Sequence, residues 1–437
     1  MIDREAQWVA EAAGGTLVAG DPRSAGLARA VIDTRLIRPG DLFVGLPGER
    51  VDGGRFAADA LAAGAAGVLV APEHADGLEG GVVVAADDPL AALQSLARAW
   101  RRELGAKVIG VTGSTGKTST KDILTALLTH PLRTHASRQN LNTEIGLPLT
   151  ILEAPPGTEA LVLEMAMRGE GQIAELAAIA EPDVGVIVNV GPVHLELLGT
   201  VERVAAAKAE LIRDLRPGAA CVVPASEPLL DAHLRDDLQT ITFGPGGQVN
   251  LLAFDAGRVE IEAHDITVEL ELTYSEPYNL LNTLAGVAAA LAIGVRPSGR
   301  VEPAFSSMRG EIVELAGGVT VVNDCYNANP MSMRAALKHL AETPADRRVA
   351  VLGTMAELGP DAEAFHHEIG REAAELGVDV LITVGAEAVP YADEFDGESY
   401  STGRPEEAGA LLAEIALPGD RVLIKGSRSV GLERVLA

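Results

Sequence analysis

The chain has 437 residues, 47% of them hydrophobic, which excludes an intrinsically disordered protein and gives enough length for about three globular domains. Aspartate and glutamate total 62 against 35 lysines and arginines, and the formal net charge of −27 argues against nucleic acid or an anionic membrane as a partner. The two cysteines, Cys221 and Cys325, are too few for a disulfide framework and form no C-x-x-C metal site. We therefore expect a cytoplasmic protein that holds any anionic substrate with local cations or a metal ion.

The N-terminal region, residues 1–102, is predicted to form a small α/β domain. Charged residues interrupt its first turns, so no secretory signal is expected, and no apolar run reaches the roughly 18 residues of a membrane span. Valine-rich segments at 40–48, 67–72 and 81–86 alternate with alanine- and leucine-rich segments of helical period. This alternation is typical of a small sheet covered by helices.

The middle region, residues 103–312, is predicted to contain a mostly parallel sheet. Its β-branched runs at 107–113, 160–167, 184–191 and 219–225 are followed by segments of helical period, as expected for helices on both faces. From 249 to 274 the pattern changes to strict alternation, which predicts antiparallel strands at one edge of that sheet, followed by a helix over 279–294.

The C-terminal region, residues 313–437, repeats the strand and helix alternation. Strands are predicted at 318–326, 347–355, 379–385 and 421–427, with a helix at 365–377 whose first histidines, His366 and His367, are expected at the surface. A doubly wound, Rossmann-like domain follows from this order. The predicted fold class is therefore α/β with three domains.

A glycine-rich loop lies between the first strand of the middle region and a helix. The common phosphate loop begins with a glycine where this chain has Val111, but the remainder of the pattern is present. Its glycines allow backbone amides to turn toward a phosphate, Lys117 reaches the β- and γ-phosphates, and the Thr118 hydroxyl binds Mg²⁺. The alternative is a glycine-rich turn with an exposed lysine. The predicted phosphate-binding residues are Gly113, Ser114, Thr115, Gly116, Lys117, Thr118 and Ser119.

Two further strand ends in the middle region carry metal-ligating side chains. Glu164 lies at the end of one predicted strand and His194 follows another, so both should emerge at the same sheet edge as the phosphate loop. A carboxylate and an imidazole meeting there would bind a divalent ion beside the γ-phosphate, although each alone is typical of a solvated strand end. Lys208 lies on an alanine-rich helix, where a lysine is usually a surface residue.

Other polar residues leave their alternatives open. Asn279 and Asn282 share a helix face and point to one ligand, unless Asn279 caps the helix. Asp324 ends a strand before a turn rich in asparagine and proline, so it binds a ribose hydroxyl or forms a tight turn. Lys425 and Arg428 follow the last strand and form a candidate clamp for a carboxylate or phosphate.

Seven motifs together resemble, in order and spacing, the ATP-dependent Mur ligases of peptidoglycan synthesis. They are TGSTGKTST, NLNTEIGLP, LEMAMRGEGQI, NVGPVHLELLGTVERVAAAKAELI, NLLNTLAG, DCYNANPMSM and KGSRSVGLERV. The N-terminal IDTRLIRPGDLFVGLPGE resembles the uridine nucleotide domain of that family, so the resemblance spans nearly the whole chain. It implies a UDP-binding domain, a central ATPase domain and a Rossmann-like domain that closes over the site.

Within the family, the resemblance is to the branch that joins D-alanyl-D-alanine to UDP-N-acetylmuramoyl-tripeptide through an acyl phosphate. A neighbouring branch typically has Tyr-Ala-His where this chain has CYNANP, and Asp-His-Leu-Asp where it has PVHLELLG. The alternatives are that neighbouring branch, a folylpolyglutamate synthase-like ligase, and a nucleotide-binding module without catalysis. The implied ligands are ATP, Mg²⁺, the UDP-muramoyl tripeptide and D-alanyl-D-alanine, bound by a monomer without nucleic acid or membrane insertion.

The resemblance also assigns roles to residues. It implies that Asn282, Arg309 and Asp324 contact the nucleotide, and that Thr118, Glu164 and His194 hold magnesium. The implied catalytic residues are Lys117, Lys208, His194 and Arg309, with Lys208 matching a lysine that is carbamylated in several members. The implied substrate contacts are Thr34, Arg35, Asn142, Thr143, Asn327, Asn329, Lys425, Ser427 and Arg428. Thr354 and Gly54 stand where many members have aspartate and histidine.

Overall fold

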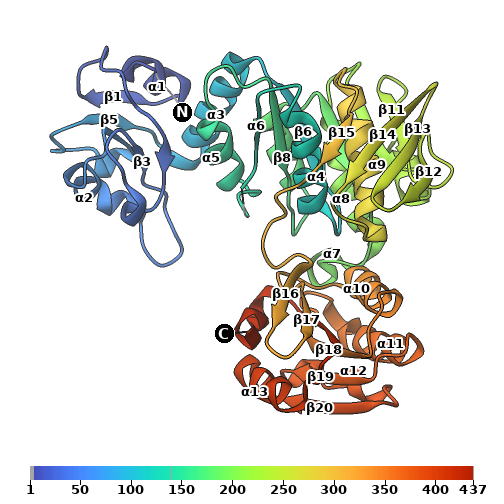
Figure 1. The fold of residues 1–437 in the computed structure, drawn as a ribbon. Coiled ribbons are helices and arrows are strands. Elements are labelled where there is room, and N and C mark those ends of the chain that lie inside the picture. The colour runs from blue at the N-terminus through green and yellow to red at the C-terminus, as the bar shows by residue number, and fades with distance from the viewer. Residues whose placement is uncertain (1–3, 139, 437) are drawn as a thin grey trace.

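The computed structural model describes residues 4–138 and 140–436, which form three β-sheets of five, ten and six strands, each covered by helices (Figure 1). The sheets follow one another along the chain, as the blue, green-to-yellow and red parts of the ribbon show. The α/β class with three units is confirmed. Among the described helices, none is both long and apolar enough to cross a membrane.

The first sheet has the strand order β1-β5-β4-β3-β2, antiparallel only between β1 and β5. Its last helix, α3, begins at Pro89, where the Asp88 side chain accepts from Leu90 N and Ala91 N. It ends at Leu104 and is capped by Gly105, whose φ is 62°. Because α3 packs on both α1 and α5, it joins this unit to the next. The elements are α1 (Ala6–Ala12), β1 (Thr16–Ala19), β2 (Ala30–Val31), η1 (Thr34–Leu36), β3 (Leu42–Val44), η2 (Gly53–Phe56), α2 (Ala57–Ala62), β4 (Gly67–Val70), η3 (Pro72–His74), β5 (Val82–Ala85) and α3 (Pro89–Leu104).

The second sheet has the order β15-β14-β13-β12-β11-β10-β9-β6-β8-β7. The strands from β7 to β11 are parallel, and β12, β13 and β14 pair antiparallel as predicted. Its elements up to α8 are β6 (Lys107–Thr112), α4 (Lys117–Thr129), β7 (Thr134–Ala136), α5 (Gly146–Glu153), β8 (Ala160–Glu164), α6 (Gln172–Ala180), β9 (Val184–Ile187), α7 (Leu195–Leu198) and α8 (Val201–Asp214). The remainder are β10 (Ala220–Pro224), η4 (Pro228–His233), β11 (Gln239–Phe243), β12 (Val249–Asp255), β13 (Arg258–Ala263), β14 (Ile266–Leu272), α9 (Pro277–Ala292) and β15 (Gly299–Val301).

Both faces of the parallel part are buried, which explains its uninterrupted apolar runs. Ile109 and Val111 of β6 face a cluster with α4 and α9, whereas Val108 faces a cluster with α6 and α8. Since β8 and β9 lie on either side of β6, their carboxyl ends meet at the loop that precedes α4. This edge holds the candidate site.

The third sheet has the order β16-β17-β21-β18-β19-β20, parallel except for the β16–β17 pair. The sequence does not predict β16 or β20, because these edge strands are polar and largely exposed. His366 is 1% exposed, so its predicted surface position is wrong. The elements are β16 (Glu311–Leu315), β17 (Val319–Asn323), α10 (Pro330–Glu342), β18 (Arg347–Gly353), η5 (Gly359–Asp361), α11 (Ala362–Glu375), β19 (Val380–Val384), η6 (Ala386–Ala388), α12 (Pro390–Asp393), β20 (Glu398–Thr402), α13 (Pro405–Ile415), β21 (Asp420–Lys425), η7 (Arg428–Val430) and η8 (Leu432–Leu436).

Candidate active site

The phosphate loop turns between β6 and α4 and is fastened to the end of β9. Asn189 Oδ1 accepts from Ser114 N at 3.1 Å and from Thr115 N at 2.9 Å, and Asn189 Nδ2 donates to Thr115 O at 3.0 Å. The Ser114 hydroxyl donates to Gly191 O and accepts from Gly191 N. The side chain of Ser114 therefore holds the loop in place. Asn189 is a site residue that the sequence interpretation missed, although it lies within the strand predicted at 184–191.

Gly116 allows close contact between this loop and α9. Its φ is +77°, and a Cβ built there would lie 2.7 Å from Asn282 Oδ1. A larger residue would be strained in backbone conformation and would collide with the asparagine. Asn282 Nδ2 in turn donates to Asn279 Oδ1 at 3.2 Å, and Asn279 Nδ2 donates to Glu276 Oε2, so both amides of the predicted pair are held side by side.

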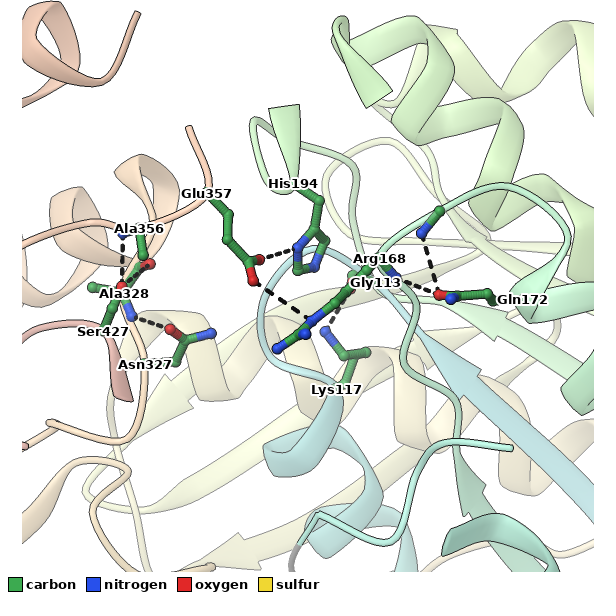
Figure 2. A network of polar contacts seen from close by, with 11 residues as sticks. Gly113, Lys117, Arg168, Gln172, His194, Asn327, Ala328, Ala356, Glu357 and Ser427 are labelled. Carbon is green, nitrogen blue, oxygen red and sulfur yellow. Dashed lines mark hydrogen bonds and ion pairs between the residues drawn. The ribbon is translucent and has the colours of Figure 1, made fainter. Parts of the chain in front are cut away.

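Lys117 opens α4 with its ammonium turned back over the loop. Lys117 Nζ donates to Gly113 O at 2.8 Å, as drawn in Figure 2. Burial lowers the pKa of Lys117, the positive charge of Arg309 lowers it further, and the carboxylate of Glu164 opposes both effects. The ammonium of Lys117 therefore interacts electrostatically with Arg309 and Glu164, two residues that are expected to surround a bound phosphate.

Glu164, at the end of β8, is 1% exposed, and each of its carboxylate oxygens accepts a hydrogen bond. Its Oε2 accepts from Thr118 Oγ1 at 2.8 Å, and its Oε1 accepts from Asn142 Nδ2 at 2.9 Å. A hydroxyl and a carboxylate oxygen side by side are the hard donors that Mg²⁺ prefers, and Mg²⁺ usually completes its shell with water and phosphate. Among the described residues no group of three or more histidines, cysteines and carboxylates is placed to hold a metal.

His194 precedes α7 and lies across from a carboxylate of the third-sheet unit. His194 Nδ1 is 2.5 Å from Glu357 Oε2, and Figure 2 shows the two side chains facing each other beside Lys117. Burial lowers the pKa of His194, while the charge and hydrogen bond of Glu357 oppose that shift. A neutral imidazole is the form that binds a metal.

Lys208 is 2% exposed inside α8, so the surface position usual for such a lysine is excluded. Burial lowers its pKa well below the ordinary value, and the charge of Lys117 lowers it further. A lysine in this environment favours the unprotonated amine, which is the nucleophilic form.

A cavity of about 510 Å³ extends from the phosphate loop to the third-sheet unit. Arg309 lies over the ring of Tyr326, with its Cζ 4.1 Å from the ring centroid, and its buried Nε has no hydrogen-bond partner among the described residues. A guanidinium held by an aromatic face with a free donor is suited to an anionic ligand. The cavity is lined by Ser114, Thr115, Gly116, Lys117, Thr118, Ser119, Glu164, Asn282, Arg309, Asp324, Asn327, Asn329 and Lys425, among others.

Several predicted substrate contacts have protein partners. Lys425 Nζ is 2.6 Å from Asp324 Oδ2, Ser427 Oγ accepts from Ala356 N at 2.9 Å, and Asn329 Oδ1 caps α10 by accepting from Ser332 N at 2.9 Å. Arg428 pairs with Glu433 at 3.2 Å.

Other predicted contacts lie in the first two units. Thr34 and Arg35 form η1 in the first-sheet unit, where the Arg35 side chain is 86% exposed and pairs with Asp33. Thr143 Oγ1 accepts from Gly146 N at 3.4 Å where α5 begins.

The structure shows the surroundings of Gly54 and Thr354, the two positions where many family members have histidine and aspartate. A Cβ at Gly54 would lie 2.2 Å from the His74 ring, and His74 Nε2 is 2.7 Å from Asp52 Oδ2, so the space above Gly54 is filled by another histidine. The backbone carbonyl of Thr354 accepts from Ser427 N at 2.9 Å.

Comparison with known proteins gives concordant matches along the chain. Residues 30–101 match the model described as Mur ligase family, catalytic domain; residues 111–290 match the Mur ligase middle domain; residues 308–428 match the Mur ligase, glutamate ligase domain. The UDP-N-acetylmuramoyl-tripeptide--D-alanyl-D-alanine ligase of Bacillus subtilis strain 168 is 36% identical, over 100% of this chain and 98% of the relative.

Solved structures agree with this match. MurF from Acinetobacter baumannii superposes with a TM-score of 0.89 at 28% identity, covering 100% of this chain and 98% of that one. MurF from Thermotoga maritima in complex with ADP gives 0.81 at 34% identity, covering 93% and 96%.

Proposed function

The chain belongs to the Mur ligase family, and we propose that it is the ATP-dependent ligase that joins D-alanyl-D-alanine to UDP-N-acetylmuramoyl-tripeptide. The observation that carries the proposal is a single cavity lined by the phosphate loop on one side and by Asp324, Asn327 and Lys425 on the other. A nucleotide on the loop then faces a unit that presents polar groups to a second substrate. The names of the full-length relatives supply the substrates.

In the proposed first half-reaction, a carboxylate oxygen of the tripeptide attacks the γ-phosphorus of ATP. The bond to the bridging oxygen of ADP breaks, and an acyl phosphate forms. Two polyanions must approach each other on an acidic protein, so the cations must be local. Lys117 and Arg309 supply them. Thr118, Glu164 and His194 would hold magnesium, whose charge would offset that of the phosphates.

In the second half-reaction, the amine of D-alanyl-D-alanine attacks the acyl carbon. The tetrahedral intermediate collapses, phosphate leaves, and the amine loses its proton. Since an acyl phosphate would hydrolyse in water, the third-sheet unit must cover the cavity while this step proceeds. Asn327, Ser427 and Arg428 lie on the segments that would face the dipeptide, and Asn142 and Thr143 are proposed to contact the tripeptide.

Lys208 is proposed to act after reaction with carbon dioxide. The buried, unprotonated amine favoured by its lowered pKa is the form that attacks carbon dioxide to give a carbamate and release a proton. The carbamate would place an anion where the neutral amine stood, near Lys117 and the metal-binding side chains.

Product formation with matched donors and acceptors tests the proposal. ADP release and ligated product are measured with UDP-muramoyl tripeptides that differ in their third residue, with a UDP-muramoyl dipeptide and with a folate. Each is combined with D-alanyl-D-alanine, D-alanine, a diamino acid or glutamate as acceptor. We expect turnover only with a tripeptide and the dipeptide. Turnover of a UDP-muramoyl dipeptide with a single amino acid would instead identify the neighbouring branch, and glutamate addition to a folate would identify a folylpolyglutamate synthase-like ligase.

The proposal places the reaction in the cytoplasm, where nucleotide-linked precursors are soluble, and treats the chain as a monomer. Light scattering during turnover measures the molar mass in solution and so tests whether the chain stays monomeric.

A further inference from the structure

The segment that follows β18 carries Glu357 from the third-sheet unit to the second. Glu357 Oε2 is 2.5 Å from His194 Nδ1, and the backbone carbonyl of Glu357 accepts from Glu196 N at 3.2 Å. Figure 2 shows this carboxylate between the imidazole of His194 and the guanidinium of Arg168, with a dashed line to each. Glu357 of the third-sheet unit is thus bonded through its side chain to His194 and through its backbone to Glu196, both in the second-sheet unit. His194 is one of the predicted metal ligands.

Both residues of this contact have unusual backbone conformations. Glu357 has φ 64° and His194 has φ 54°, in the left-handed region that residues other than glycine seldom occupy. Such conformations cost free energy and persist where the surrounding structure holds them, commonly at functional sites. Two of them facing each other across a unit boundary indicate that the contact has a role.

The residues before Glu357 are anchored within the third-sheet unit. Ala356 N donates to Ser427 Oγ at 2.9 Å, and Met355 N donates to the buried His366 Nε2 at 3.0 Å. Ser427 Oγ also lies 3.5 Å from Ala328 O, next to Asn327 (Figure 2). The position of Glu357 is therefore set by the same segments that line the proposed dipeptide side of the cavity.

The chemistry of the contact determines which nitrogen of His194 is available. An ionised carboxylate only accepts hydrogen bonds, so His194 Nδ1 carries the proton and Nε2 keeps its lone pair. A carboxylate on the far nitrogen of a metal-binding histidine fixes the tautomer and the ring orientation and makes the ligand more basic.

We propose that Glu357 is a positioning residue that orients His194 for magnesium only when the third-sheet unit is docked on the second. The inference rests on the proposed function, because it takes His194 as a metal ligand. Closure over the substrates would thereby complete the metal site, so that ATP is not activated before the cavity is covered.

A plain ion pair between the units is the competing explanation. Arg168 Nε lies 3.5 Å from Glu357 Oε1, and the Arg168 side chain is 72% exposed. Exposed pairs of this kind contribute about 0 to 1 kcal/mol. Arg168→Met removes this pair and leaves the His194 contact intact, so it is the matched control.

Affinity for Mn²⁺, measured by electron paramagnetic resonance on the full chain with a non-hydrolysable ATP analogue, tests the proposal. Glu357→Leu should weaken Mn²⁺ binding by about 10- to 100-fold. Glu357→Gln keeps an acceptor oxygen and should lose about threefold or less, and Arg168→Met should remain within twofold. Unchanged Mn²⁺ affinity in Glu357→Leu, or an equal loss in Arg168→Met, would overturn the proposal.

A double-mutant cycle distinguishes a specific effect of Glu357 on His194 from a general loss of structure. In a His194→Asn background, adding Glu357→Leu should change Mn²⁺ affinity by less than twofold, because the imidazole it positions is gone. An equally large loss in that background would show that Glu357 acts elsewhere. The measurement needs only metal and nucleotide, so it succeeds or fails independently of which tripeptide or acceptor amine the enzyme uses.

Discussion

Asp324 and Lys425, which both line the proposed nucleotide cavity, form an ion pair with Lys425 Nζ 2.6 Å from Asp324 Oδ2. The Lys425 side chain is 3% exposed and also donates to Asn327 O at 3.0 Å. The end of β21 is thereby tied to the turn after β17. The sequence predicts that each residue contacts a ligand. In the structure each is also the charge partner of the other, so single and double mutants can separate a role in ligand binding from a role in stability.

Asp324→Ala should destabilise the third-sheet unit by about 3 to 5 kcal/mol, because it leaves the buried ammonium of Lys425 without its carboxylate. The double variant Asp324→Leu with Lys425→Met should recover most of that loss, since it removes both charges together. Urea unfolding of the three proteins measures the difference. A double variant no more stable than Asp324→Ala would show that the pair is not the source of the effect.

Lys117→Met should lower turnover by about 10²- to 10⁴-fold, because its ammonium is the group of the loop that meets the transferring phosphoryl charge. Single-turnover ADP formation with saturating substrates separates this loss from weaker binding. Lys107→Met, at the exposed start of β6, is the control and should leave turnover unchanged. Near-normal turnover in Lys117→Met would contradict the proposed phosphoryl transfer.

Lys208→Met should raise the unfolding temperature at pH 6 by a few degrees, because it removes a buried amine whose charged form burial disfavours, while keeping a chain of similar length. The folded pKa of Lys208 lies well below its unfolded value of 10.5. Between those two values the unfolded state binds more protons, so wild-type stability rises with pH through that window. The advantage of the variant should therefore shrink from pH 6 to pH 9.

Calorimetry without nucleotide or metal measures this trend, and Lys338→Met on the exposed face of α10 controls for charge removal alone. A pH-independent difference would contradict a lowered pKa at Lys208.

Carbamylation of Lys208 has its own test. Lys208→Ala should lose most ligase activity, and short carboxylates such as formate or acetate should restore part of it by taking the place of the carbamate. Chloride at equal ionic strength is the control. Full activity in Lys208→Ala would exclude a catalytic carbamate.

The periodicity of the chain predicts much of the fold for a physical reason. Parallel strands buried on both faces read as apolar runs, and the carboxyl ends of β6, β8 and β9 must share an edge, which brings Thr118 and Glu164 together. Burial of Lys208 is not predictable in this way, because alanines on one helix do not reveal what packs against them. The role of Glu357 is not predictable either, because it depends on a contact with His194, a residue of another unit that is distant in sequence.

Asn189 also shows what motif matching overlooks, since its amide fastens the phosphate loop without belonging to it. Asn189→Ala removes three hydrogen bonds to Ser114 and Thr115 and should weaken binding of an ATP analogue by about tenfold or more. Asn189→Asp keeps the two acceptor contacts but loses the donor and adds a negative charge beside the phosphates. It should bind the analogue no better than Asn189→Ala, and the deficit should shrink at high salt. Isothermal calorimetry at two salt concentrations measures both effects. Wild-type affinity in Asn189→Ala would mean that the loop keeps its shape without this side chain.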